Sequence, residues 1–97
     1  MSLSKSPHVL ADELVELSAE FGRLSDALGE IVPLKAIDWK VLREESKSIT
    51  ETDRKWELSE RGVREKVIEI KLGSLVRKMS AIKTYLKVLS DETHNMY

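Results

Sequence analysis

Two stretches of the chain repeat apolar residues at alternating steps of four and three positions, and each repeat has seven members. This spacing gathers the apolar side chains on one narrow stripe of an α-helix, as in the seam of a coiled coil. The pattern predicts an all-α protein with two long helices. The first seam is Leu10, Leu14, Leu17, Phe21, Leu24, Leu28 and Ile31, and the second seam is Ile68, Leu72, Leu75, Met79, Ile82, Leu86 and Leu89.

Prolines set the expected limits of the first helix. Ser6 and Pro7 are typical of a helix start, because a serine hydroxyl caps the first turn and proline is tolerated there. Pro33 disfavours helical backbone angles at Val32, so the first helix is expected to span residues 7–32. Residues 1–5 precede this start and are expected to be disordered.

The middle of the chain carries a weaker pattern, and residues 34–53 are predicted to form a short or broken helix. Ser48 and Glu51 have the spacing of a capping box, which favours a restart between residues 46 and 53; a continuous, solvated helix is the alternative. A long last helix is expected over residues 54–91, followed by a tail over 92–97. β-Branched residues within 55–73 leave open a short β-hairpin that pairs residues 55–58 with 66–72.

Two seams of equal length in 97 residues favour a single domain built as an antiparallel helical hairpin or three-helix unit. Glu13 lies level with Lys78 when Glu20 lies level with Lys71, so one register satisfies both attractions. A two-helix hairpin leaves one side of each seam open, and dimerisation into a helical bundle would cover it. The expected interface therefore contains both seams except Ile31. A monomeric three-helix bundle is the alternative.

Two other features bear on packing. Trp56 is assigned either to the core or to the interface with a partner, because large aromatic side chains often supply interface energy. A row of small residues follows the first seam at the same steps and includes two glycines, each of which costs a helix about 1 kcal/mol relative to alanine. This cost predicts that a second helix packs closely against the row. The small row is Ala11, Val15, Ser18, Gly22, Ser25 and Gly29.

The chain is almost neutral, with 16 basic and 17 acidic residues, but its charges are separated. Residues 1–33 hold two basic and six acidic residues, a net charge of −4, whereas residues 54–90 hold ten basic and four acidic residues, a net charge of +6. We expect the acidic and basic helices to neutralise each other; contact with nucleic acid is the alternative. The candidate nucleic-acid contacts are Lys71, Arg77, Lys78, Lys83 and Lys87, which spread around the helix.

No residue pattern indicates catalysis, a cofactor or a metal site. The chain has no cysteine, its four glycines are isolated, and its two histidines lie near opposite ends. The tail residues Asp91, Glu92 and His94 are interpreted as a solvated terminus rather than as metal ligands. No apolar run reaches the roughly 18 residues of a membrane span. The chain is therefore expected to be a cytoplasmic, non-enzymatic protein without a cofactor and without membrane association.

These observations predict a helical protein–protein interaction module, such as an adaptor, scaffold or regulatory subunit. The module is expected to self-associate as a homo-oligomer, with a dimer favoured, and to bind an unknown protein partner. The alternative is a small DNA- or RNA-binding accessory protein, of phage or plasmid type, that uses the basic helix over residues 71–87. A weaker option is a chaperone or secretion partner with an exposed apolar groove. Helical seams occur in proteins of many functions, so the process and the partner do not follow from the sequence.

Overall fold

The computed structural model describes residues 6–95, with the side chains of residues 6–92, and this range contains three helices. They are α1 (Pro7–Glu45), α2 (Ile49–Leu58) and α3 (Glu60–Asn95). No residue in the described range belongs to a strand, so the all-α prediction is confirmed. The expected disordered start over 1–5 and the side chain of His94 lie outside the described residues.

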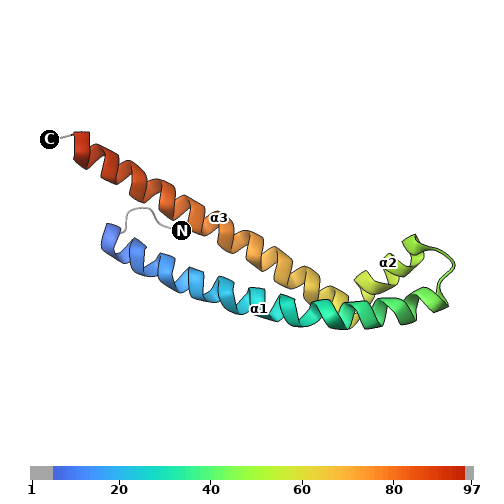
Figure 1. Ribbon diagram of the computed structural model, residues 1–97. Coiled ribbons are helices and arrows are strands. Elements are labelled where there is room, and N and C mark those ends of the chain that lie inside the picture. Colours follow the sequence, from blue (N-terminus) through green and yellow to red (C-terminus); the bar gives the residue numbers. More distant parts are fainter. Residues whose placement is uncertain (1–5, 96–97) are drawn as a thin grey trace.

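The two long helices run antiparallel to each other, and the short α2 joins them at one end (Figure 1). The chain forms a rod with extents of 68 × 21 × 19 Å and a radius of gyration of 20.0 Å. A compact domain of this length has a radius of gyration of roughly 12 Å, so the rod has an unusually thin core. The start of α1 and the end of α3 lie together at the open end (Figure 1). We call the closed end, where α2 packs against both long helices, the elbow.

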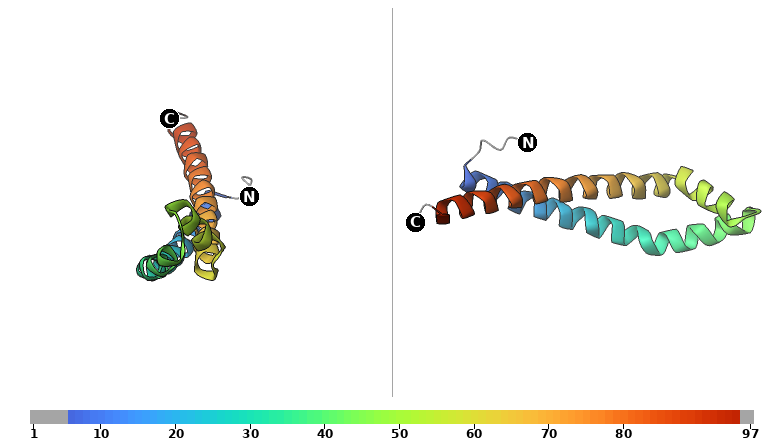
Figure 2. Two further views of the ribbon diagram at one scale, coloured as in Figure 1. Left: turned by 90° about the vertical axis from the view of Figure 1, so that its right-hand side faces the viewer. Right: turned by 90° about the horizontal axis from the view of Figure 1, so that it is seen from above.

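The first helix does not end before its second proline: α1 continues through Pro33 to Glu45, so the predicted limit at residue 32 is wrong. A proline inside a helix removes one backbone hydrogen bond, and α1 changes direction past its middle, where the colour passes from cyan to green (Figure 2). The helix persists because Trp39 and Leu42, which follow the proline, pack against the core around Trp56. Tertiary packing therefore outweighs the local preference.

The predicted helix restart between residues 46 and 53 is confirmed, because α2 begins at Ile49. The hydroxyl of Ser48 caps α2 by accepting a hydrogen bond from the backbone N–H of Glu51 at 3.1 Å. In return the Glu51 carboxylate accepts one from the backbone N–H of Lys47 at 3.0 Å, and it lies 3.4 Å from the ammonium of Lys55. The hydrogen bond from Lys47 is the main reason why the pKa of Glu51 is lowered below its ordinary value.

A single serine separates the second helix from the third. The hydroxyl of Ser59 donates to the carbonyl of Trp56 at 2.6 Å and accepts a hydrogen bond from the backbone N–H of Gly62 at 3.1 Å. α3 then runs to Asn95, because no proline or glycine after Gly73 interrupts it. Both the β-hairpin alternative for 55–73 and the predicted helix limit at 91 are therefore wrong.

The observed register of the hairpin differs from the predicted one. Ser18 on α1 contacts Met79 on α3, with 3.6 Å between the hydroxyl oxygen and the sulfur. This contact puts Lys78 level with Glu20 rather than with Glu13, so the predicted register is wrong by about one heptad. The prediction rested on flanking charges alone, whereas the contacts at the elbow described below also constrain the register.

Candidate functional site

Both seams are covered by the hairpin, but the coverage is incomplete. Of the fourteen seam residues, five are buried and nine keep an intermediate exposure. The buried members are Leu10, Ile31, Ile68, Leu75 and Ile82. The half-buried members are Leu14, Leu17, Phe21, Leu24, Leu28, Leu72, Met79, Leu86 and Leu89. Each half-buried member therefore keeps part of its side chain accessible in the single chain.

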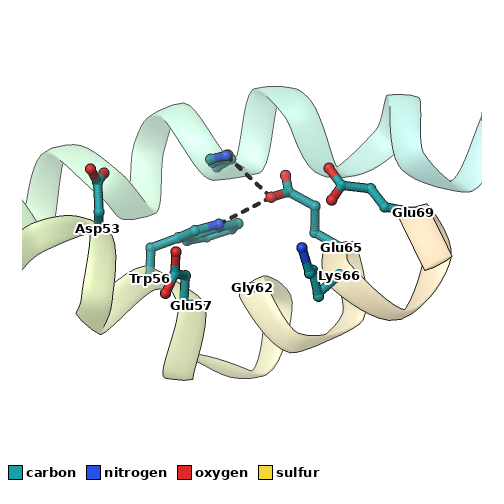
Figure 3. A pocket seen from close by; sticks show the side chains of 8 residues that line it. Asp53, Trp56, Glu57, Gly62, Glu65, Lys66 and Glu69 are labelled. Atoms are coloured by element: carbon teal, nitrogen blue, oxygen red, sulfur yellow. Dashed lines mark hydrogen bonds and ion pairs between the residues drawn. The ribbon is translucent and has the colours of Figure 1, made fainter.

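A polar cluster joins all three helices at the elbow (Figure 3). One carboxylate oxygen of Glu65 on α3 accepts hydrogen bonds from the ammonium of Lys35 on α1, at 3.2 Å, and from the indole N–H of Trp56 on α2, at 3.3 Å. The ammonium of Lys35 also lies 5.4 Å from the centroid of the Trp56 ring, within the range of a cation–π contact. Trp56 is only 3% exposed, so it is a core residue in this structure and not an accessible anchor for a partner.

A second ion pair lies beside this cluster. One guanidinium nitrogen of Arg61 lies 2.8 Å from each carboxylate oxygen of Asp38. Lys35 and Asp38 continue the 4-3 steps of the first seam, and Glu65 and Arg61 extend the second seam toward the elbow. The first seam therefore continues beyond Pro33, and both seams change from apolar to charged residues toward the elbow. Sequence reasoning missed these four residues because it followed only apolar side chains.

A hollow in the elbow is bordered by this polar cluster. It contains no histidine, and its central carboxylate, Glu65, already accepts two hydrogen bonds. Within the described part of the chain, no three histidine, aspartate or glutamate side chains are grouped to hold a metal ion. The arrangement acts to close the elbow by tying α1, α2 and α3 together. The lining residues are Lys35, Asp53, Trp56, Glu57, Gly62, Glu65, Lys66 and Glu69.

The row of small residues on α1 is only partly covered by α3. Ser18 contacts Met79 and Ser25 is half-buried, but a Cβ atom added at Gly22 or Gly29 would meet nothing within 4 Å. The prediction of close packing is therefore wrong for the two glycines within one chain, because α3 packs on the seam and leaves their side of α1 open. The uncharged pattern continues toward the elbow through Val32 and Ala36. We call the whole face the uncharged edge: Ala11, Val15, Ser18, Gly22, Ser25, Gly29, Val32 and Ala36.

The five basic residues of the second half of α3 are all exposed. Within the described residues, none of them forms an ion pair, whereas Lys35, Lys55 and Arg61 nearer the elbow do. The expected neutralisation between the acidic and basic helices is thus not formed by direct ion pairs of these five side chains. They are Lys71, Arg77, Lys78, Lys83 and Lys87.

Comparison with known protein families, with curated proteins and with solved structures finds no match to this chain. Of the helices in residues 6–95, none combines the length and apolar character that crossing a membrane requires.

Proposed function

We propose that this protein is a non-enzymatic helical interaction module that self-associates into a dimer. The observation that carries the proposal is the incomplete closure of the seams, in which nine of fourteen apolar residues stay half-buried. Burying apolar surface stabilises a fold by about 25 cal/mol per Å², so a second copy that covers these side chains would add stability that the single hairpin lacks. Small domains with thin cores commonly depend on such association.

The surface area of the chain supports this proposal. Its accessible surface is 7234 Å². A globular chain of 11.1 kDa exposes about 5,700 Å² on the usual relation between surface and mass, so the rod exposes an excess of roughly 1,500 Å². A standard protein–protein interface buries about 800 Å² per partner, which is well within this excess. An interface of standard size is therefore compatible with the exposed area of the chain.

The uncharged edge is the side of the hairpin that a second copy would cover at least electrostatic cost. Val15 and Val32 on this edge are 69% and 60% exposed. The opposite edge of the seam carries Glu13 and Glu20, whose charges would lose hydration in an interface.

A pair of matched valine variants tests this proposal. Val15→Glu places a charge on the uncharged edge, whereas Val41→Glu places one on the outer side of α1, where the valine is 51% exposed. Neither valine is buried, so both variants should keep the helix content of the parent. In sedimentation experiments we expect Val15→Glu to dissociate to a monomer and Val41→Glu to remain a dimer. Identical masses for the two variants would contradict the proposed interface.

Nucleic-acid binding is the second candidate function, favoured by the five unpaired basic side chains of α3. Such binding depends steeply on salt, because each phosphate contact releases condensed counterions. The test is a titration of duplex DNA and of single-stranded RNA at two salt concentrations. Loss of binding when all five basic residues are changed to glutamine would support this function, and absence of binding at low salt would rule it out.

A further inference from the structure

α3 carries a second row of residues at 4-3 steps, on a face that the hairpin leaves bare. The row lies roughly 140° around the helix from the seam. Four of its members are β-branched aliphatic residues with exposures between 43% and 60%. Toward the end of the helix it borders a shallow apolar hollow that includes Ala81, Tyr85 and Val88. We call this row the outer row: Val63, Val67, Ile70, Ser74, Arg77, Ala81, Thr84 and Val88.

Both sides of the outer row carry basic residues, together with Gly73, Ser80 and Tyr85. Arg64, Lys71 and Lys78 follow one side, and Lys66 and Lys87 follow the other; all five are exposed. Arg77 lies within the row itself, and its guanidinium folds toward Gly73, 3.6 Å from the position that a Cβ there would take. The face is thus a row of five apolar residues interrupted by Ser74, Arg77 and Thr84, with basic residues on both sides.

We propose that the outer row is a docking surface for an acidic amphipathic helix of a partner protein. Apolar residues at 4-3 steps on that helix would pack on Val67, Ile70 and Val88, and acidic residues beside them would face the flanking basic residues. An acid facing Arg77 would fix the register, as polar residues in helical seams do. This inference goes beyond self-association, which uses the other faces of the hairpin.

The charges argue against two other occupants of the outer row. If a second copy docked here in antiparallel fashion, with the row centred between Ser74 and Arg77, Lys71 would face Lys78 of the second copy and repel it. A lipid surface is disfavoured because helices that bind membranes present a broad face with bulky leucine, phenylalanine or tryptophan. The outer row is narrow, has no such residue and contains Arg77 in its middle.

A synthetic helical peptide tests the proposal with the full chain. The probe has four heptads with leucine or isoleucine at the seam positions and glutamate at both flanks; its control peptide has lysine in place of glutamate. We expect the acidic peptide to bind by fluorescence anisotropy, and the lysine peptide not to bind. Ile70→Asp should weaken binding by about tenfold or more. Val41→Asp, at an exposed valine on α1 (51% exposed, against 60% for Ile70), should leave binding unchanged.

The same samples separate this inference from the proposed self-association. Sedimentation of Ile70→Asp should give the parent mass, because the outer row is not the self-association surface. Loss of dimerisation in Ile70→Asp would mean that a second copy occupies the row and would overturn the proposal. The proposal would also be overturned if the acidic peptide did not bind, or if its binding survived Ile70→Asp. A third contrary result would be binding of the chain to anionic vesicles that is lost in Ile70→Asp.

Discussion

Three glycines should respond differently to alanine, and the difference tests the geometry of the elbow: Gly22 and Gly29 lie in the interior of α1, and Gly62 lies in the first turn of α3. An added methyl at Gly62 would overlap the carbonyl oxygen of Trp56 and lie 2.7 Å from its carbonyl carbon. Both atoms belong to the backbone, so α2 has to move away from α3. At Gly22 and Gly29 the same methyl meets nothing within 4 Å. The added methyl group is therefore the same at all three positions, and its neighbours differ most at Gly62.

The expected magnitudes follow from the helical preference and from the burial of Trp56. Alanine is favoured over glycine inside a helix by about 1 kcal/mol, which is the stabilisation expected at Gly22 and Gly29 when no neighbour interferes. A tryptophan buries roughly 150–250 Å², worth about 4–6 kcal/mol at 25 cal/mol per Å². If the displaced α2 exposes half of this area, Gly62→Ala loses about 2–3 kcal/mol. It regains at most about 1 kcal/mol, because Gly62 lies in the first turn of α3, so the net destabilisation is roughly 1–3 kcal/mol.

Urea unfolding followed by circular dichroism measures these differences. The chain should be dilute enough to be monomeric, so that the free energy of unfolding refers to the hairpin alone. We expect Gly62→Ala to unfold at a lower urea concentration than the parent, and Gly22→Ala and Gly29→Ala to unfold at higher ones. A stabilised Gly62→Ala would refute the close approach of α2 and α3. A Gly22→Ala variant that is less stable would show that the uncharged edge is covered within one chain.

Further predictions concern the proline, the elbow and the cap of α2. Pro33→Ala should stabilise the chain by up to about 3 kcal/mol in thermal unfolding, because α1 is continuous there; no gain would indicate a helix break. Glu65→Ala should lower the free energy of unfolding, measured in urea, by about 1–3 kcal/mol, because it leaves the indole N–H of Trp56 without a partner. Asp38→Ala removes a more exposed ion pair and should lower the free energy of unfolding by less than about 1 kcal/mol. Equal losses in the two variants would contradict this difference. Because folding lowers the pKa of Glu51, the carboxylate stabilises the fold fully at a pH above its ordinary pKa, and this stabilisation is lost as the pH falls through the lowered pKa of the folded state. Helix content should therefore drop on acidification by less in Glu51→Gln than in the parent.

The helical class and the seams could be predicted because apolar periodicity is a local property of the sequence. The capping pair at Ser48 and Glu51 is equally local, and its prediction is confirmed. The limit of α1 was not predictable from Pro33, because the packing of residues 35–42 on the elbow decides it and involves segments distant in the sequence. The register of α1 against α3 was not predictable for the same reason, because contacts between distant segments determine it.

The candidate surfaces could also be predicted only in part from the sequence. The small row and the basic residues were visible in the sequence, but whether another helix covers them depends on where α3 packs. Trp56 could be assigned to the core only once its 3% exposure was known. The ionic extension of the seam through Lys35 and Glu65 was present in the spacing. It was missed because charged residues were not counted as seam members.

Light scattering on a sizing column at low and high salt measures whether the chain self-associates. We expect about twice the 11.1 kDa mass of one chain at both salt concentrations, because apolar side chains and not ion pairs would hold the copies together. A mass of 11.1 kDa at both salt concentrations, even at high protein concentration, would rule out the proposed dimer.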